Sequence, residues 1–293
     1  VDKIAREEVQ MADLTDPVRL QAKLAEIGPA KEKAIADMGG DPTVVRYQPF
    51  IDEYLEIGKR LKDRVTDVSR EINIAILEEK SVLAEGAQGA FLDVIHGTQK
   101  FVTSSFTTAG SACANLGVGP VMVDNVVGVI KAYITRVGEG PMPTELKDDM
   151  GSMMREKGGE YGTTTGRARR CGWFDAVLGL KSVYLNGYTE LALTKMDVLT
   201  GINPIRICVG YELDGEKLGY PPEGTAELAR CRPIYEDMPG WTEDITAVKE
   251  YEDLPENARA YVERLEDLLG VDVSAVSIGP GREQTIYRDE VDE

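Results

Sequence analysis

The chain has 293 residues, of which 42% are hydrophobic and 29% charged, and its 51 acidic against 33 basic side chains give a formal net charge of −18. A chain of this length and apolar content buries a substantial core, which excludes collagen-like, mucin-like and disordered proteins. So acidic a chain also lacks the surplus of Lys and Arg with which nucleic-acid-coating proteins displace counterions from phosphates. We therefore expect a folded protein with no nucleic-acid partner.

Cysteine usage and the apolar runs bear on the compartment. The cysteines form no Cys-x-x-Cys pair and lie far apart, at Cys113, Cys171, Cys208 and Cys231. This spacing suggests neither a zinc knuckle nor a disulfide framework. No apolar run approaches the roughly 18 residues of a spanning helix, and the first residues do not have the pattern of a secretory signal. We expect a cytoplasmic protein without a membrane partner.

Two helices are expected in the first quarter of the chain. The first begins at Asp16-Pro17, an N-cap followed by a proline at the first helical position, and ends before Gly39-Gly40. The second is expected to run from Pro49 to about Glu79, because apolar residues recur there every three or four positions. Its apolar stripe is read as core packing.

Short apolar runs follow, each ending in glycine or a polar cluster, and they predict strands of a sheet with helices on its faces. The runs lie at residues 82–84, 126–137, 191–193, 205–211 and 273–278, and helices are expected at 173–186 and 255–270. The Gly- and Pro-rich stretch 211–241 suggests a small surface hairpin layer. The expected fold is therefore α/β, with a mostly parallel central sheet flanked by helices and a small additional antiparallel layer, in one domain over residues 1–293.

A group of arginines stands out in this acidic chain. Residues 162–170 hold three arginines within four positions, behind three threonines and between two glycines. Arginine forks suit carboxylates and phosphates, glycines let the backbone approach a ligand, and threonine hydroxyls donate and accept. The segment therefore predicts a loop that closes on an anion, although a solvated turn whose arginines pair with surface carboxylates explains the same spacing.

Two strand ends carry further candidate binding groups, since ligands bind such sheets where strands end. Asp197 follows the run at 191–193, and a carboxylate there could select guanine, which presents paired N–H donors on one edge. A turn or capping aspartate is the alternative. The run at 273–278 ends in a glycine turn that can offer backbone groups to a ligand.

In chain order, these segments together resemble the adenylosuccinate synthetase family from end to end. The matching motifs lie at residues 85–89, 93–98, 102–105, 136–145, 162–173, 194–197, 233–241 and 277–280. The resemblance implies a ligase of AMP biosynthesis that uses GTP to join IMP and L-aspartate, through a 6-phosphoryl-IMP intermediate, into adenylosuccinate, GDP and phosphate. It also implies a P-loop-NTPase-like fold, a Mg²⁺ cofactor and a homodimer.

The resemblance also implies roles for individual residues. IMP would be bound by Arg6, reaching across the dimer interface, and by Gln88, Thr103, Val137, Gly138 and Arg167. Aspartate would be bound by Thr163, Thr164, Thr165, Gly166, Arg167, Ala168 and Arg169. GTP would be bound by Arg169, Lys195, Met196, Asp197, Ser277, Ile278 and Gly279.

One departure from the family pattern qualifies this interpretation. The family's glycine-rich phosphate loop, its aspartate that acts as base and magnesium ligand, and its acid histidine have no counterpart in the 293 residues. We therefore expect the C-terminal two thirds of a synthetase, with no catalytic or metal-binding residue of its own and inactive alone. The alternatives are a non-catalytic nucleotide-binding or interaction module, or a relative that acts on a guanylate-type substrate.

Overall fold

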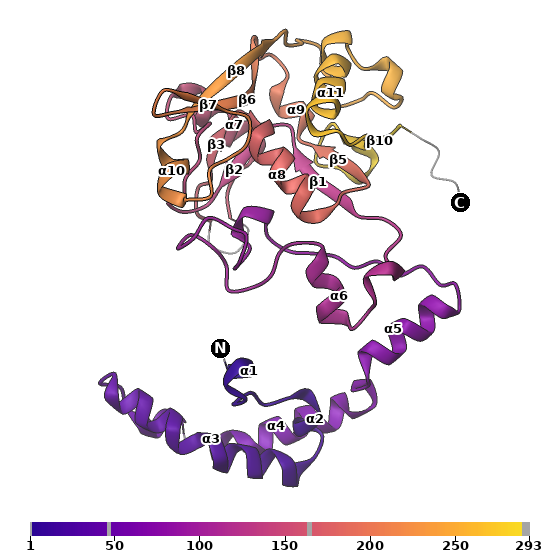
Figure 1. Cartoon of the computed structure of the whole chain (residues 1–293). Helices are drawn as coiled ribbons and strands as arrows, with labels where there is room; N and C mark the ends of the chain where they lie inside the picture. Colours follow the sequence, from indigo (N-terminus) through magenta and orange to yellow (C-terminus); the bar gives the residue numbers. More distant parts are fainter. Residues whose placement is uncertain (1, 46–47, 163–165, 289–293) are drawn as a thin grey trace. The chain divides into compact units, whose positions relative to one another are not determined.

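A computed structural model of the chain describes residues 2–45, 48–162 and 166–288. The chain forms two compact units, residues 1–82 and 83–293, which are coloured from indigo to yellow along the sequence in Figure 1. The expectation of one domain over residues 1–293 stays a prediction.

The first unit is helical in its described residues. Its helices are α1 (Asp2–Ala5), α2 (Met11–Leu14), α3 (Pro17–Asp37), α4 (Gln48–Leu61) and α5 (Val68–Leu77), with 3-10 turns at Pro42–Val45 and Lys62–Arg64. Helix α3 confirms the first sequence prediction. The Asp16 carboxylate accepts hydrogen bonds from the backbone N–H groups of Val18 and Arg19, which are otherwise unsatisfied at a helix start.

The single long helix expected from residue 49 to 79 is wrong. The chain leaves the helical conformation at Val65, whose ψ is 115°, and α5 then starts afresh with Asp67 as its N-cap. The Asp67 carboxylate accepts from the backbone N–H of Arg70 at 3.1 Å. Hydrophobic periodicity cannot detect this break, because the apolar stripe continues through both helices while the capping bond is local.

The second unit is built on a four-stranded sheet with the order β1-β5-β9-β10. Strands β1 (Val127–Lys131), β5 (Glu190–Thr194) and β9 (Val273–Ser277) are parallel, and β10 (Thr285–Tyr287) is antiparallel to β9. This confirms the mostly parallel central sheet. Helices α8 (Ala176–Asn186) and α11 (Glu256–Leu269) confirm the two helices expected here, and Gly270 closes α11 with a φ of 67°.

A second group of strands lies beside this sheet in the same unit (Figure 1). It contains β4 (Phe174–Asp175), β6 (Ile205–Leu213), β7 (Glu216–Leu218) and β8 (Arg232–Met238), with α10 (Thr225–Arg230) between β7 and β8. Strand β6 pairs antiparallel with β7 and β8 and parallel with β4. The small antiparallel layer is therefore confirmed.

Shorter elements complete the unit. They are the pair β2 (Ile134–Arg136) and β3 (Arg170–Gly172), the helices α6 (Gly110–Leu116), α7 (Asp149–Gly158) and α9 (Met196–Leu199), and 3-10 turns at Ala90–Leu92, Pro120–Met122, Tyr251–Asp253 and Arg282–Gln284. The strand expected at residues 82–84 is absent from the described chain. Leu83 is 92% exposed there, because no described strand pairs with this segment.

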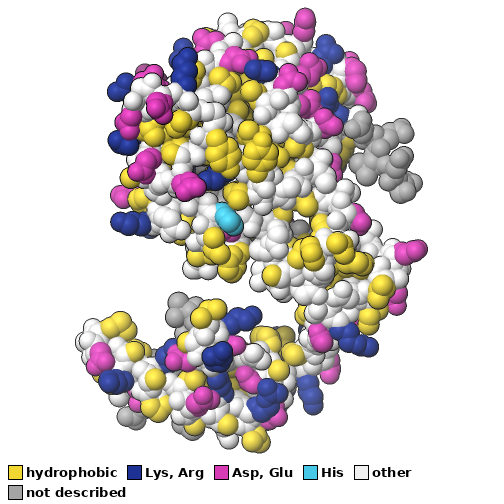
Figure 2. All heavy atoms as spheres, viewed as in Figure 1, with side chains coloured by type: hydrophobic (Ala, Val, Ile, Leu, Met, Phe, Trp, Pro, Cys, Tyr) yellow, Lys and Arg dark blue, Asp and Glu magenta, His cyan; other side chains and the backbone are white. Residues whose placement is uncertain are grey.

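Buried aliphatic and aromatic side chains fill the space between sheet and helices. Leu191, Leu193 and Val276 from the strands, Ile278 after β9 and Tyr261 of α11 belong to one core cluster, and none of these side chains is exposed. On the face drawn in Figure 2, acidic and basic side chains of the larger unit are interspersed. In the described part of the chain, no helix combines the length and apolarity that crossing a membrane requires.

Candidate functional site

Three strand ends meet at one edge of the central sheet. Strands β1, β5 and β9 are parallel neighbours, so their carboxyl ends lie side by side, with Lys131 paired to Thr194 and Leu193 to Val276. The residues that follow β5 and β9 are therefore brought together, as ligand sites of such sheets require. They are the residues expected to bind guanine, Lys195, Met196, Asp197, Ser277, Ile278 and Gly279.

One carboxylate oxygen of Asp197, at this edge, lacks within the described chain the hydrogen-bond partner that a buried oxygen usually has. Its Oδ1 is buried and has no hydrogen-bond partner among the described residues. A buried acceptor without a donor costs about 1–3 kcal/mol, a cost that a donor supplied by a ligand would remove. Met196 and Ile278 on either side are fully buried in the core and hold the edge rigid.

Lys195 is fixed by its backbone and by its side chain. It has a φ of 68°, and its Nζ donates to the carbonyl of Gly158 at 2.7 Å. Across from it, the Ser277 hydroxyl donates to the carbonyl of Gly279 at 3.0 Å. Both strand ends are thus held by hydrogen bonds within the unit, one of them to a distant residue, Gly158, and one of them local.

A buried carboxylate, that of Glu160, gathers cations beside this edge. Lys131 Nζ donates to both carboxylate oxygens, at 2.9 and 2.8 Å, Arg169 Nη1 donates to Oε2 at 2.8 Å, and the Tyr133 hydroxyl donates to Oε1 at 2.7 Å. Burial alone raises the pKa of Glu160, but the bonds from Lys131, Tyr133 and Arg169 outweigh it and hold that pKa below its usual value. The carboxylate is therefore ionised at neutral pH.

The predicted anion-binding loop starts at Glu160 and returns to it. Gly162 N–H donates to the Arg167 carbonyl at 2.8 Å and Arg169 N–H donates to the Glu160 carbonyl at 2.9 Å. Gly166, whose φ is 63°, donates its backbone N–H to the Gly162 carbonyl at 2.7 Å. Gly166, Arg167 and Ala168 are exposed at the loop. Thr163, Thr164 and Thr165 lie outside the described residues.

The three arginines of this segment have different surroundings. Arg167 is exposed, and Arg169 is bound to Glu160. Arg170 forms a fork to Glu145, at 2.8 and 2.6 Å, and donates to the carbonyls of Gly138 and Gly140. Because Glu160 and Glu145 are both largely buried, the alternative of arginines paired with surface carboxylates is wrong for Arg169 and Arg170.

The expected IMP residues Gln88 and Thr103 belong to a loop held by the buried carboxylate of Asp93. Its Oδ1 accepts from the backbone N–H groups of Ile95 and His96, both at 2.9 Å, and its Oδ2 accepts from that of Thr107 at 2.7 Å. Burial raises the pKa of Asp93, but these backbone donors outweigh it and hold the pKa below its usual value. The loop is therefore fixed although it contains no strand.

Two further bonds tie the IMP residues to this loop. Thr103 N–H donates to the Leu92 carbonyl at 2.8 Å, and the Thr107 hydroxyl donates to the carbonyl of Gly89, next to Gln88, at 2.9 Å. Gln88 is exposed and has a φ of 62°. The structure thus places Gln88 and Thr103 in one tightly bonded segment.

Arg136 joins that loop to Val137 and Gly138, the other residues expected to line the IMP pocket. Its Nη2 donates to the Thr98 hydroxyl at 2.6 Å and to the Phe101 carbonyl at 2.9 Å. Its Nε is buried without a partner in the part of the chain that the structure describes. The next residue, Val137, is 44% exposed, and Gly138 has a φ of 82°.

Arg6 belongs to the first compact unit and follows α1. Its φ is 62°, its side chain is exposed, and its carbonyl accepts from Lys23 Nζ at 2.9 Å. Its expected role at the IMP phosphate of a neighbouring protomer stays a prediction.

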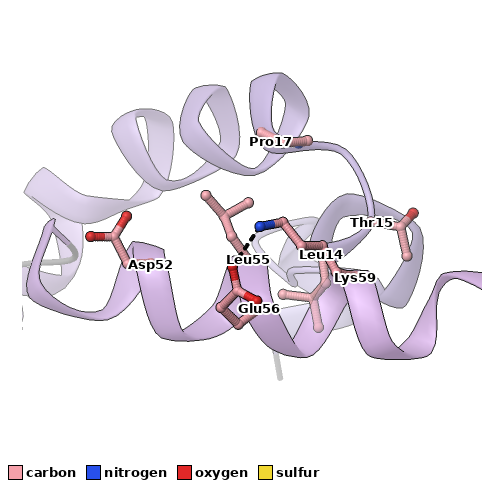
Figure 3. Close-up of a pocket in the computed structure, with 7 residues that line it drawn as sticks. All are labelled: Leu14, Thr15, Pro17, Asp52, Leu55, Glu56 and Lys59. Atoms are coloured by element: carbon pink, nitrogen blue, oxygen red, sulfur yellow. Dashed lines mark hydrogen bonds and ion pairs between the residues drawn. The ribbon is translucent and has the colours of Figure 1, made fainter.

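The first unit also contains a pocket that is separate from all these residues. It lies against α4, lined by Leu14, Thr15, Pro17, Asp52, Leu55, Glu56 and Lys59. Figure 3 shows its Lys59 bonded to Glu56, so the lysine charge is already matched. Expected site residues are absent from this lining.

Sequence reasoning missed Lys131, Arg136 and Glu160. Each carried a weak signal: Lys131 interrupts the apolar run 126–137, Arg136 precedes a glycine turn, and Glu160 precedes the arginine loop. Burial and partners distant in the chain reveal their importance, and neither can be read from spacing.

Comparison with known proteins identifies the family. The family model described as adenylosuccinate synthetase matches residues 1–286. The chain belongs to the adenylosuccinate synthetase family. It is 74% identical over 287 residues to the adenylosuccinate synthetase of Methanothrix thermoacetophila and 49% identical over 289 residues to that of Streptococcus sanguinis. These matches cover 98% and 97% of this chain, and 68% and 66% of the relatives.

A solved structure agrees with this family membership. The fully ligated adenylosuccinate synthetase of Plasmodium falciparum superposes with a TM-score of 0.90 at 35% identity, over 98% of this chain and 68% of that one. The predicted fold class is confirmed. The predicted function is confirmed as well: the family is one of ligases that use GTP to join IMP and L-aspartate in AMP biosynthesis.

Proposed function

We propose that the strand ends of β5 and β9 bind GTP in this reaction, with Asp197 selecting the guanine base. The observation that carries the proposal is the buried, unpartnered Oδ1 of Asp197 at the edge where β5 and β9 end. Guanine offers two N–H donors on one edge, which a carboxylate can accept together. The stem of Lys195, held by Gly158, can cover the base. Ser277 and Gly279 complete the pocket from β9.

The loop over residues 162–169 binds L-aspartate in this proposal, through Arg167 and through residues 163–165. Arg167 also reaches IMP, and Arg169 reaches GTP. The γ-phosphoryl group of GTP is first transferred to O6 of IMP as the N1 proton is lost, which releases GDP. The aspartate amine then attacks C6 and displaces the phosphate. Phosphoryl transfer depends mainly on positioning and on charge stabilisation, which guanidinium groups supply.

IMP is bound in this proposal by Gln88 at the base and by Thr103 near the phosphate, with Val137 and Gly138 along the pocket. The hydrogen bonds of Asp93 and Arg136 support this assignment. They hold the loop that carries Gln88 and Thr103 in shape and fix it against the segment that carries Val137 and Gly138. Prebuilt loops of this kind reduce the ordering cost of binding.

The cofactor, oligomer and compartment are part of the same proposal. Mg²⁺ accompanies the nucleotide, the enzyme is a cytoplasmic homodimer, and Arg6 of one protomer contacts IMP bound to the other. In the described ranges, no three His, Cys, Asp or Glu side chains gather into a metal site. We therefore assign no residue of this chain to the metal and derive no step through it.

Replacing Asp197 tests the guanine pocket. In the enzyme that forms adenylosuccinate, Asp197→Asn should lower the ratio of kcat/KM for GTP to that for ATP by about tenfold to a hundredfold, since one N–H of guanine loses its acceptor. Asp214→Asn is the matched control, because Asp214 pairs with Arg230 at the exposed surface. A variant that prefers GTP as strongly as the parent enzyme would refute the pocket.

Replacing Arg167 tests the loop. Arg167→Leu should lower kcat/KM for aspartate about a hundredfold or more, because a charged partner of the reacting groups is lost. The melting temperature should not change, since Arg167 is exposed. Arg230→Leu, at another exposed arginine, serves as the control. Unchanged aspartate-dependent turnover in Arg167→Leu contradicts the assignment.

A further inference from the structure

Glu160 joins the strand-end site to the arginine loop. It is 1% exposed and bonds to groups from two other parts of the chain: Lys131 at the end of β1 with Tyr133 just beyond it, and Arg169 at the end of the loop. Its own carbonyl also accepts from the Arg169 backbone. One side chain therefore sets the position of β1, the loop and the arginine relative to one another.

The charges around Glu160 do not cancel. Lys131 and Arg169 carry two positive charges against one negative charge, so the cluster has an excess of one positive charge at neutral pH. The side chains of Lys131 and Arg169 are 27% and 30% exposed, whereas the carboxylate is hidden. Lys131 Nζ also donates to the Thr135 hydroxyl at 2.8 Å, so its three N–H groups are taken, whereas Arg169 commits only Nη1 to the carboxylate. The partly exposed cations thus offer their charge, and Arg169 its remaining N–H groups, while the anion stays behind them.

A third cation lies close to this cluster. Burial lowers the pKa of Lys131, the Glu160 carboxylate opposes that shift, and the charges of Arg169 and Lys195 add to it. Lys195 directly follows β5 and Lys131 ends β1, and these two strands are paired. Cations gathered at one sheet edge form an anion-binding surface, since their repulsion is relieved when a negative ligand binds.

Stability alone is a poor reason for such a cluster. Replacing buried ion pairs by apolar groups is often neutral or stabilising, because the desolvation cost is large. Fixed geometry is the gain that remains. A guanidinium with one N–H committed to a buried carboxylate has its plane fixed, and its other N–H groups then point in set directions.

We propose that Glu160 is a positioning residue, which holds Lys131 and Arg169 as a fixed pair of cations for an anionic group of a substrate. The anionic group is either the GTP phosphates or the carboxylates of aspartate. The inference rests on the proposed function, in which Arg169 reaches GTP from the aspartate loop, and adds Lys131 and Glu160 to it.

The test is steady-state kinetics of Glu160→Gln in the enzyme that forms adenylosuccinate, with each substrate varied in turn. Glutamine keeps the shape but loses the charge, so KM for GTP, for aspartate or for both should rise about tenfold or more, and KM for IMP should stay within about twofold. A rise for GTP alone assigns the pair to the phosphates, and a rise for aspartate alone assigns it to the carboxylates.

Glu236→Gln is the matched control. Glu236 also pairs with an arginine, Arg264, through two bonds of 2.9 and 2.8 Å, but it joins β8 to α11 instead of lying at the strand ends. All three KM values should be unchanged in this variant. If Glu236→Gln raises KM for GTP or aspartate as much as Glu160→Gln does, the effect is not specific and the inference fails.

Two further variants separate positioning from stability and from the proposed function. If Glu160→Gln folds poorly, Glu160→Gln/Lys131→Met removes the uncompensated lysine, and it should recover the parent melting temperature while KM stays raised. The inference is overturned if the double variant recovers both the parent melting temperature and the parent KM, or recovers neither of them. It is also overturned if Glu160→Gln folds and its KM values for GTP and aspartate are unchanged. Arg169→Leu tests the proposed function itself: if it raises KM and Glu160→Gln does not, only the positioning role is lost.

Discussion

The regions around Asp93 and Glu160 each contain a buried carboxylate, but the two carboxylates are neutralised in different ways. Asp93 is surrounded by backbone N–H groups, whereas Glu160 is surrounded by Lys131, Arg169 and a tyrosine hydroxyl. Backbone donors hold a loop in shape and add no charge. Side-chain cations leave an excess of positive charge at the surface.

This difference matches the ligands proposed for the two regions. The Asp93 region needs a loop of set shape for IMP, and a carboxylate that accepts several backbone N–H groups provides it. The Glu160 region needs cations in fixed directions for phosphates or carboxylates. A buried acid can thus fix the shape of one site and the electrostatic potential of another.

Removing the Asp93 carboxylate should have the largest effect. Asp93→Ala leaves the N–H groups of Ile95, His96 and Thr107 buried without acceptors, which should lower the free energy of unfolding by about 3–5 kcal/mol. Urea denaturation at pH 7 measures this change in the free energy of unfolding.

The stabilisation by Asp93 should also depend on pH. Because the pKa of Asp93 is lowered in the folded state, its contribution to the free energy of unfolding is present above the usual aspartate range and is lost as the pH falls through the folded pKa.

The same variant tests whether the two regions are independent. IMP binding should weaken in Asp93→Ala, while GTP binding at the strand ends should be retained, since those residues are held by the sheet. Equilibrium binding of each nucleotide to the folded protein checks this. Equal losses for IMP and GTP would contradict the comparison.

A third buried carboxylate, Asp175, has few hydrogen-bond donors and no cation bonded to it in the described chain, and its replacement should have a smaller, opposite effect. It is 1% exposed and accepts from the Tyr211 hydroxyl at 2.6 Å and from the N–H of Leu178 at 3.1 Å. Burial raises its pKa to about 6, against the lowering effect of these bonds. An acid with a raised folded pKa favours folding below its unfolded pKa, and this advantage is lost as the pH rises through the folded value.

Asp175→Asn should therefore stabilise the protein above pH 6, by an amount on the order of 2–3 kcal/mol, and should change little near pH 4. Asparagine keeps the N-cap of α8 and can still accept from Tyr211. Thermal unfolding from pH 4 to 8 measures the difference. A difference that does not grow over this range would show that Asp175 is solvated or paired.

The smallest effect is expected at Gly140, next to the IMP region. A Cβ at this position would overlap the guanidinium of Arg136, so Gly140→Ala should displace Arg136 from Thr98 and Phe101. KM for IMP should rise about tenfold, which corresponds to about 1.4 kcal/mol, while KM for GTP should not change. Gly219→Ala is the control, because a Cβ there meets no atom within 4 Å. An unchanged KM for IMP excludes the role of Arg136.

Local signals predicted the elements that depend on neighbouring residues. Asp16-Pro17 marked the start of α3, and Gly270 marked the end of α11, because caps and glycine C-termini act within a few residues. The same kind of signal is present at Asp67, a capping aspartate that begins a second helix within one continuous apolar stripe. Periodicity alone joined α4 and α5 into one helix.

The arginine segment shows where local signals end. Arg167, Arg169 and Arg170 look alike in the sequence, yet only Arg169 meets Glu160 and only Arg170 meets Glu145, which is 25 residues earlier. Which arginine pairs with which carboxylate depends on the surfaces that the fold brings together and on the carboxylates that it buries. The spacing of residues along the sequence does not specify either of these.

The sequence by itself determined the family, the mostly parallel sheet and the strand ends and loops that carry the expected ligand residues, because these follow from motif order and from hydrophobic patterns along the chain. Only the tertiary structure decided which charges meet. Lys131 lies 29 residues from Glu160, and Arg136 lies 38 residues from Thr98. Burial makes these contacts strong, since a group removed from water depends on its few protein partners.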